Sequence, residues 1–117
     1  MVEVEIRRTA SSFAMTCQNH AGTEALCAAV STLLFTLAGC MRNEQGVYID
    51  AERLEPGDAQ LTYRFSRSGA LRRRQEAICD EIAVGFLQLQ ASLPRDIRVL
   101  IIGGKSFRQG GVSLEKV

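Results

Sequence analysis

The sequence predicts an α+β domain with a mixed sheet and two helices packed on it. Two long segments have the spacing of helices, and five shorter segments, most of them alternating between apolar and polar residues, are typical of strands. These segments follow the order ββαββαβ, which favours a sheet with helices packed against it. A length of 117 residues, 46% of them apolar, suits one domain with a substantial core.

The first two strands are predicted from alternation near the N-terminus. In residues 2–7, Val and Ile alternate with Glu and Arg, and residues 13–18 show the same period of two. We expect these two strands to form a hairpin. Cys17 then shares a face with Phe13 and Met15, so its side chain is expected in the core.

A long apolar helix is predicted over residues 24–41. Thr23 suits the N-cap position, and apolar residues lie all round the helix, so we expect it to be the central helix of the fold. The uncharged stretch 25–41 reaches the lower limit for crossing a bilayer, but no basic or aromatic residues cluster at both of its ends. The pattern therefore favours a buried helix over a membrane span.

The middle of the chain predicts two strands joined by a turn. The strands are expected at about 46–53 and over 61–66, where apolar and polar residues alternate. Between them, Glu55-Pro56-Gly57-Asp58 has the chemistry of a turn, because Pro fixes φ and Gly can adopt a positive φ. Three apolar residues of the first of these strands are expected on one face: Val47, Ile49 and Ala51.

A second helix and a last strand complete the predicted fold. Residues 69–92 carry an apolar stripe at steps of three and four, which is typical of a helix packed on one side. Near its start, Arg72-Arg73-Arg74 forms either a solvated face or a contact to a substrate or an acidic partner, and Arg72 can pair with Glu76. The nearly wholly apolar run 97–102 predicts a central strand.

Charge and cysteine content limit the partners and the compartment. Fourteen Lys and Arg against thirteen Asp and Glu give a net charge of +1, which argues against nucleic-acid and polybasic membrane-surface binding. The N-terminal residues 1–8 lack the apolar stretch of a secretory signal. We therefore expect a cytoplasmic protein whose four cysteines are reduced thiols.

The strongest candidate site is formed by His20 and Cys27. His20, the only histidine, lies on a loop after a strand, and Cys27 lies in the first turn of the next helix. Backbone N–H groups at a helix N-terminus stabilise a thiolate. A nearby imidazole can accept the thiol proton and later protonate a leaving amine. The simpler interpretation, a core cysteine and a solvated histidine, stays open at this point, and Glu24 would oppose the thiolate unless it pairs with His20.

A zinc site is the alternative use of the same residues. Cys17 and His20 have a spacing found in metal sites, and Cys27 and Cys40 would have to complete the ligand set. The predicted strand places Cys17 in the core, and Cys40 lies thirteen residues after Cys27, on a different face of the helix. We therefore expect no metal, and we expect Cys40 and Cys79 to be ordinary buried thiols.

The segment around these residues resembles a known family. His20-Ala21-Gly22 followed by Cys27-Ala28-Ala29-Val30-Ser31 is similar to the ribosomal-processing cysteine protease family (Prp, YsxB-like). Gly57-Asp58 and the segment 85–89 also resemble parts of that family. The resemblance predicts a protease domain over residues 1–102, followed by a C-terminal tail over 103–117.

The resemblance implies a small cysteine endopeptidase without a cofactor, commonly a homodimer. It gives Cys27 the role of nucleophile and His20 that of base. Glu24 and Ser31 are possible supporting residues, although Ser31 could instead bond back to the carbonyl of Cys27, one helical turn earlier. Family members remove an N-terminal extension from a ribosomal protein, and relatives process phage capsid and scaffold proteins, so the implied partner is a protein substrate.

Three departures from the family pattern favour a phage or prophage member. Asn19 replaces a Gly before the histidine, only six residues separate His20 from Cys27, and Glu24 replaces an Asp. The leading hypothesis is a cytoplasmic Cys/His endopeptidase, and the alternative is a catalytically inactive dimeric interaction module of the same fold.

Overall fold

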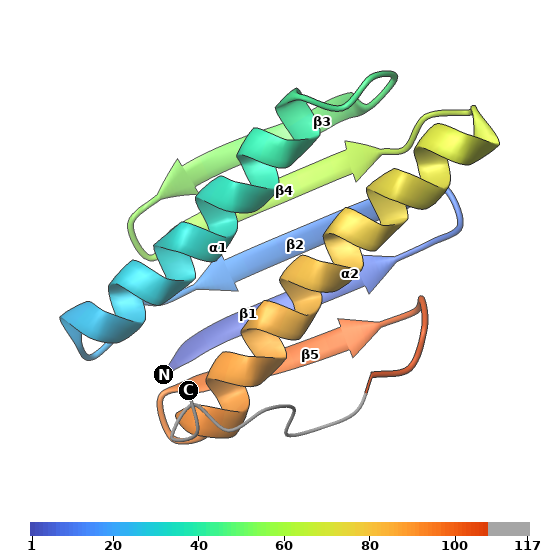
Figure 1. Ribbon diagram of the computed structural model, residues 1–117. Coiled ribbons are helices and arrows are strands. Elements are labelled where there is room, and N and C mark those ends of the chain that lie inside the picture. Colours follow the sequence, from blue (N-terminus) through green and yellow to red (C-terminus); the bar gives the residue numbers. More distant parts are fainter. Residues whose placement is uncertain (108–117) are drawn as a thin grey trace.

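The computed structural model describes residues 1–107 and shows a five-stranded sheet with two helices on one of its faces (Figure 1). This arrangement confirms the predicted α+β class, the mixed sheet and the order ββαββαβ. Most of the predicted tail, residues 103–117, lies outside the described residues. The elements are β1 (Val2–Arg8), β2 (Ser12–Gln18), α1 (Glu24–Arg42), β3 (Tyr48–Glu55), β4 (Asp58–Arg64), α2 (Gly69–Ser92) and β5 (Ile97–Ile102).

The strand order of the sheet, β3-β4-β2-β1-β5, brings two loops together at one end. β1 and β2 form the predicted antiparallel hairpin, and β4 pairs with β2 so that Asp58 lies opposite Gln18. The turn between β3 and β4 therefore lies beside the end of β2. From that end the chain continues through His20 into α1.

The last strand, β5, lies at the edge of the sheet, so its predicted central position is wrong. Among residues 1–107, β5 pairs only with β1, in parallel. Ile97 is fully buried, whereas Leu100 and Ile102 are 54% and 41% exposed. The apolar run therefore reflects one buried face and one open apolar face, rather than burial on both faces.

The hydrophobic core fills the space between the sheet and the two helices. The alternating apolar residues of β1 and β2 point into this core. Cys17 is one of them, as predicted. Burying one large apolar side chain of this kind contributes about 1.5–3 kcal/mol to folding. The largest fully buried side chains include Phe13, Met15, Leu26, Leu37, Leu61, Tyr63 and Phe86.

The apolar face predicted for β3 is interrupted within the strand. Ile49 pairs with Tyr63 and Ala51 pairs with Thr62, so Asp50 is an extra residue that changes the alternation. Beyond this bulge, Ala51 no longer shares the face of Ile49. The prediction that Val47, Ile49 and Ala51 share one face is therefore wrong at Ala51.

Helix α1 is buried along one side only, which corrects the prediction of a central helix with apolar contacts all round. It lies over the β3, β4 and β2 half of the sheet, while α2 covers β1 and β5 (Figure 1). Phe35, on its open side, is 60% exposed. By length and composition α1 could cross a membrane, with a mean hydropathy of 1.7. The residues that it buries are Leu26, Val30, Leu34, Leu37, Ala38 and Met41.

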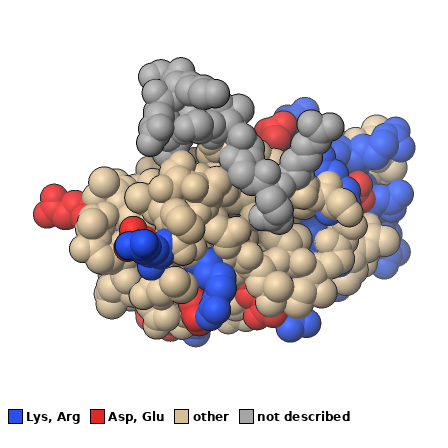
Figure 2. Space-filling view, turned by 90° about the horizontal axis from the view of Figure 1, so that it is seen from below, with Lys and Arg blue, Asp and Glu red and all other residues tan. Residues whose placement is uncertain are grey.

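Helix α2 packs against α1 and carries basic residues at its start. A Cβ atom at Gly85 would lie 2.7 Å from a methyl carbon of Leu33, so the absence of a side chain there allows the two helices to approach closely. The predicted pair of Arg72 with Glu76 is present, with 3.8 Å between nitrogen and oxygen. Seen from below, as in Figure 2, most of the visible Lys and Arg side chains lie at the right-hand end of the molecule.

Candidate active site

The loop after β2 begins with an unusual backbone conformation at Asn19. Its φ of 76° lies in the left-handed region, and Asn19 is the one non-glycine residue of the described chain with a positive φ. Asn tolerates this conformation better than most residues. The backbone N–H of Asn19 donates to the carbonyl of Gly57 at 2.9 Å, and its side-chain amide donates to the carbonyl of Met1 at 3.1 Å. These contacts direct the chain away from β2 and toward α1.

Cys27 is held by a capped helix start. Thr23 has an extended backbone, and its hydroxyl oxygen accepts a hydrogen bond from the N–H of Leu26 at 3.2 Å, as expected for the predicted N-cap. The N–H of Cys27 donates to the carbonyl of Thr23 at 3.1 Å. Cys27 is the one exposed cysteine of the four in the chain. Its thiol therefore combines access to solvent with the positive end of the α1 dipole.

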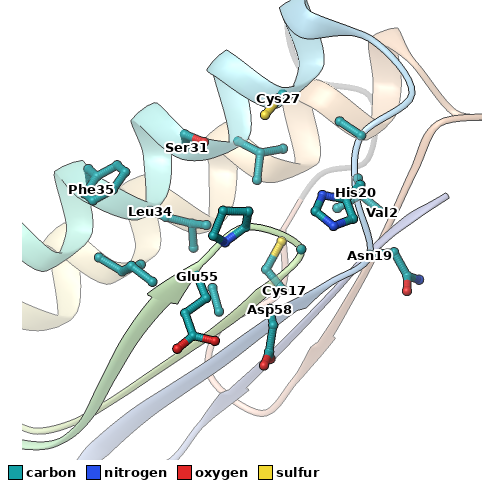
Figure 3. A pocket seen from close by; sticks show the side chains of 16 residues that line it. Val2, Cys17, Asn19, His20, Cys27, Ser31, Leu34, Phe35, Glu55 and Asp58 are labelled. Atoms are coloured by element: carbon teal, nitrogen blue, oxygen red, sulfur yellow. The ribbon is translucent and has the colours of Figure 1, made fainter.

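His20 and Cys27 line the same pocket, which has a volume of about 180 Å³ (Figure 3). The pocket lies between the start of α1, the loop after β2 and the turn between β3 and β4. Most of its lining is apolar, including Val2, Val30, Leu34, Phe35 and Leu54. No hydrogen bond joins the imidazole of His20 to the thiol of Cys27 within residues 1–107, although both side chains line the pocket.

The two possible supporting residues differ in their placement. Ser31 lines the pocket one turn after Cys27, and its hydroxyl makes no hydrogen bond to another described residue. The backbone-bonding role considered for Ser31 is instead taken by Thr32, whose hydroxyl donates to the carbonyl of Ala28 at 2.7 Å. Glu24 is exposed, lies outside the pocket lining and forms no ion pair with His20. The structure therefore brings Ser31, but not Glu24, into the pocket.

Two other carboxylates reach the pocket, and both are at its edge. Glu55 and Asp58 flank the turn between β3 and β4, and their carboxylate groups lie away from Cys27 and His20 (Figure 3). Asp58 instead accepts hydrogen bonds from Gln18 at 3.0 Å and Arg53 at 2.9 Å. Neither carboxylate orients the imidazole in this arrangement.

The other three cysteines are poorly placed for chemistry in this pocket. Cys17 lies in the pocket wall, and burial raises the pKa of its thiol to about 11. Burial also raises the pKa of the Cys79 thiol to about 12, and Cys40 is partly buried against the core. Among residues 1–107, no three His, Cys, Asp or Glu side chains are grouped so that they could hold a metal ion.

Sequence reasoning missed several residues of this pocket. Phe35 follows Ser31 by four residues, so helical spacing could have placed it on the same side of α1. The contact of the turn at Gly57 with the loop at His20 depends on the pairing of β2 with β4. No local pattern in the sequence specifies that pairing.

Comparisons with known proteins identify the fold. No family model and no curated protein matches this sequence. SMU.848 from Streptococcus mutans is 17% identical, with a TM-score of 0.67 over 87% of this chain and 97% of that chain. The essential ribosomal processing protease Prp from S. aureus, in complex with a covalently linked product peptide, is 16% identical, with a TM-score of 0.66. A second structure of that protease, with a substrate peptide, has a TM-score of 0.64, and both comparisons cover 86% of this chain and 99% of the protease.

These values establish a shared architecture over nearly the whole of the described chain. Because the sequence identities are only 15–17%, these similarities establish the fold alone. The resemblance predicted from the segments around His20 and Cys27 is thus confirmed for the three-dimensional structure. The chain has the fold of the ribosomal processing protease Prp.

Proposed function

We propose that this protein is a cysteine endopeptidase in which Cys27 is the nucleophile and His20 the general base. One observation carries the proposal: the one exposed cysteine and the only histidine line the same pocket, at the start of a capped helix. A helix N-terminus favours the thiolate form of a cysteine, and an imidazole can exchange its proton. The fold shared with a protease of known structure supports the same assignment.

The reaction begins when His20 takes the proton of the Cys27 thiol. The sulfur then attacks the carbonyl carbon of a peptide bond, and the carbonyl oxygen becomes an oxyanion held by backbone N–H groups at the start of α1. As the carbon–nitrogen bond breaks, His20 gives its proton to the leaving amine. Water, deprotonated by His20, then hydrolyses the thioester and restores the free thiol.

Ser31 and Glu24 take supporting roles in this proposal. The hydroxyl of Ser31 faces the pocket without a hydrogen-bond partner in the described chain, so it is available to bond substrate or the thiolate. Glu24 is exposed and can approach His20 only by changing its side-chain conformation. We expect Ser31 to matter more to activity than Glu24.

The proposed substrate is a cytoplasmic protein with an N-terminal extension, either a ribosomal protein or a phage capsid or scaffold protein. The structure of the S. aureus protease of the same fold is a complex with a substrate peptide. The largely apolar lining of the pocket suits the apolar side chains of such a segment. We also propose that the protein acts as a homodimer, which predicts a solution mass of twice 12.8 kDa by light scattering.

The second candidate is a catalytically inactive dimeric module. The absence of a hydrogen bond between His20 and Cys27 favours it, since an activated pair needs contact at some stage. In many enzymes, however, the hydrogen bond between nucleophile and base forms only when substrate is bound. Reactivity of the thiol therefore distinguishes the two candidates.

The rate of alkylation of each cysteine by iodoacetamide between pH 5.5 and 8.5 tests the proposal. At pH 6.5 we expect Cys27 to react faster than the other cysteines, and Cys40 serves as the internal reference. His20→Ala should slow Cys27 at least tenfold at that pH, because the thiol loses its proton acceptor. A rate for Cys27 equal to that of Cys40, or unchanged by His20→Ala, would favour the inactive module.

A further inference from the structure

Gly57 lies directly against the imidazole of His20. Its φ of 72° confirms that the predicted turn requires a positive φ at this glycine. A Cβ atom at position 57 would lie 2.7 Å from Nε2 of His20, and 2.9 Å from both Cδ2 and Cε1. These distances are shorter than any normal contact of a Cβ atom. The space that a side chain at 57 would occupy is therefore filled by the imidazole.

The three distances also give the orientation of the ring. Cδ2 and Cε1 are the two atoms bonded to Nε2, and they are almost as close to the Cβ position as Nε2 itself. An approach by the edge of the ring would leave these two atoms clearly farther away. The ring of His20 therefore presents its face to Gly57. Because the lone pair and the N–H group lie in the ring plane, neither is directed at Gly57, and both stay available to the pocket.

A second contact links the same glycine to the histidine loop. The carbonyl of Gly57 accepts the N–H of Asn19, the residue before His20, at 2.9 Å. The adjacent pairing of Gln18 with Asp58 fixes this register between β2 and β4. Gly57 thus contacts both the backbone that carries His20 and the face of its ring.

From this geometry we infer that Gly57 is a positioning residue for His20: it supports the face of the imidazole, which leaves the ring nitrogens free to exchange a proton with Cys27 once the two groups meet. The inference rests on the proposed function. A side chain at position 57 would push the ring out of this orientation and leave the base unable to meet the thiol. The glycine is therefore required for the geometry of the site as well as for the turn.

The test compares Gly57→Ala with Gly46→Ala as a matched control. Gly46 lies in the connection between α1 and β3 and also has a positive φ, of 81°. A Cβ atom at Gly46 would lie 2.7 Å from the hydroxyl oxygen of Ser66. Both variants therefore impose similar backbone strain and similar crowding, but only one of them touches His20. Gly57→Asn is the second variant, because Asn adopts a positive φ more readily than Ala and preserves the turn.

Two readouts separate positioning from folding. Because the chain has one histidine, the ring protons of His20 give a single set of NMR signals that can be followed through a pH titration. We expect Gly57→Ala and Gly57→Asn to shift these signals and to lower the alkylation rate of Cys27 at pH 6.5 to that of His20→Ala. Gly46→Ala should leave both unchanged, whatever it does to the melting temperature. Combined with His20→Ala, Gly57→Ala should cause no further loss of rate.

Unchanged His20 signals and an unchanged alkylation profile in the folded Gly57 variants would overturn the inference. A further loss of rate when Gly57→Ala is added to His20→Ala would also overturn it, because the effect would not run through the imidazole. Failure of the proposed function has a different signature. In that case the His20→Ala variant alkylates Cys27 at the same rate as the parent protein. The His20 NMR signals of the Gly57 variants still report whether Gly57 positions the ring.

Discussion

At the scale of single residues, Asn19 shows how a special backbone conformation supports the site. The segment that turns from β2 into the histidine loop needs a left-handed residue, and Asn19 provides it with a φ of 76°. The family that the sequence resembles has Gly at this position, the other residue type that adopts a positive φ readily. The departure at Asn19 is therefore conservative in backbone conformation, although not in side chain.

Replacing Asn19 tests this interpretation. Asn19→Gly should change the free energy of unfolding by less than about 1 kcal/mol, because Gly adopts the conformation and only one exposed hydrogen bond is lost. Asn19→Val should lower it by about 1–2 kcal/mol, because a β-branched residue is strained at a positive φ. Urea unfolding measures both, with Ala10→Val in the exposed turn before β2 as the control. Equal stability of the Val and Gly variants would contradict the assignment.

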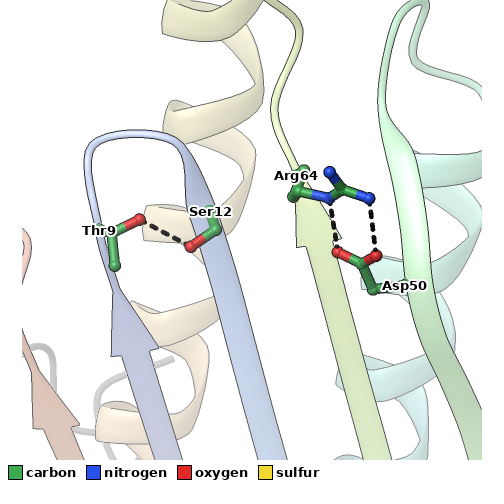
Figure 4. Close-up of polar contacts among 4 residues, drawn as sticks. All are labelled: Thr9, Ser12, Asp50 and Arg64. Carbon is green, nitrogen blue, oxygen red and sulfur yellow. Dashed lines mark hydrogen bonds and ion pairs between the residues drawn. The ribbon is translucent and has the colours of Figure 1, made fainter.

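At the scale of elements, the helices were more predictable than the strands. The apolar spacing of 69–92 and the cap at Thr23 are local signals, and the observed helices match them within one residue. The bulge in β3 is not a local signal. Asp50 is accommodated because both of its carboxylate oxygens accept hydrogen bonds from Arg64 on β4, at 2.9 and 3.0 Å (Figure 4). Only the pairing of the two strands brings these residues together.

The pocket shows the same division between local and long-range information. His20 and Cys27 could be found because the loop, the cap and the first turn of the helix follow one another within eight residues. Gly57 could be predicted as a turn glycine, but its contact with His20 depends on the neighbouring strands β2 and β4. The edge position of β5 could not be read from its apolar run, since strand order is set by the whole sheet.

The start of α1 offers a test at this scale. Thr23→Ala should lower the free energy of unfolding by about 0.5–2 kcal/mol, because the N–H of Leu26 loses its side-chain acceptor. Thr23→Ser should restore most of the loss. Thr36→Ala, at an exposed site in the same helix, is the matched control and should cost little. If Thr23→Ala and Thr36→Ala melt at the same temperature, the cap does not stabilise the helix.

At the scale of the whole molecule, the buried thiols of two cysteines and the buried hydroxyl of a tyrosine make the free energy of unfolding depend on pH. Burial raises the pKa of the Cys17 thiol from 9.0 to about 11 and that of the Cys79 thiol from 9.0 to about 12. Burial, together with a hydrogen bond to Glu52, also raises the pKa of Tyr63. In the unfolded chain these groups lose their protons first, so the unfolded state binds fewer protons at high pH.

Stability should therefore be constant with respect to these groups below about pH 9 and should fall as pH rises toward 11. Each thiol contributes a slope of at most about 1.4 kcal/mol per pH unit in that window. Urea unfolding at half-unit intervals measures the slope. Cys17→Ala and Cys79→Ala should each reduce it, and Cys27→Ala serves as the control for loss of a thiol. A slope that is the same in all three variants would show that burial of these thiols does not govern alkaline unfolding.

The central claim, that Cys27 cleaves peptide bonds, is tested most directly by N-terminal mass spectrometry. A peptide library from a bacterial proteome is incubated with the parent protein or with Cys27→Ala, and newly formed N-termini are quantified. We predict a defined set of new N-termini with the parent protein, absent with Cys27→Ala and strongly reduced with His20→Ala. New N-termini that persist with Cys27→Ala, or a library left intact by the parent protein, would contradict the proposed activity.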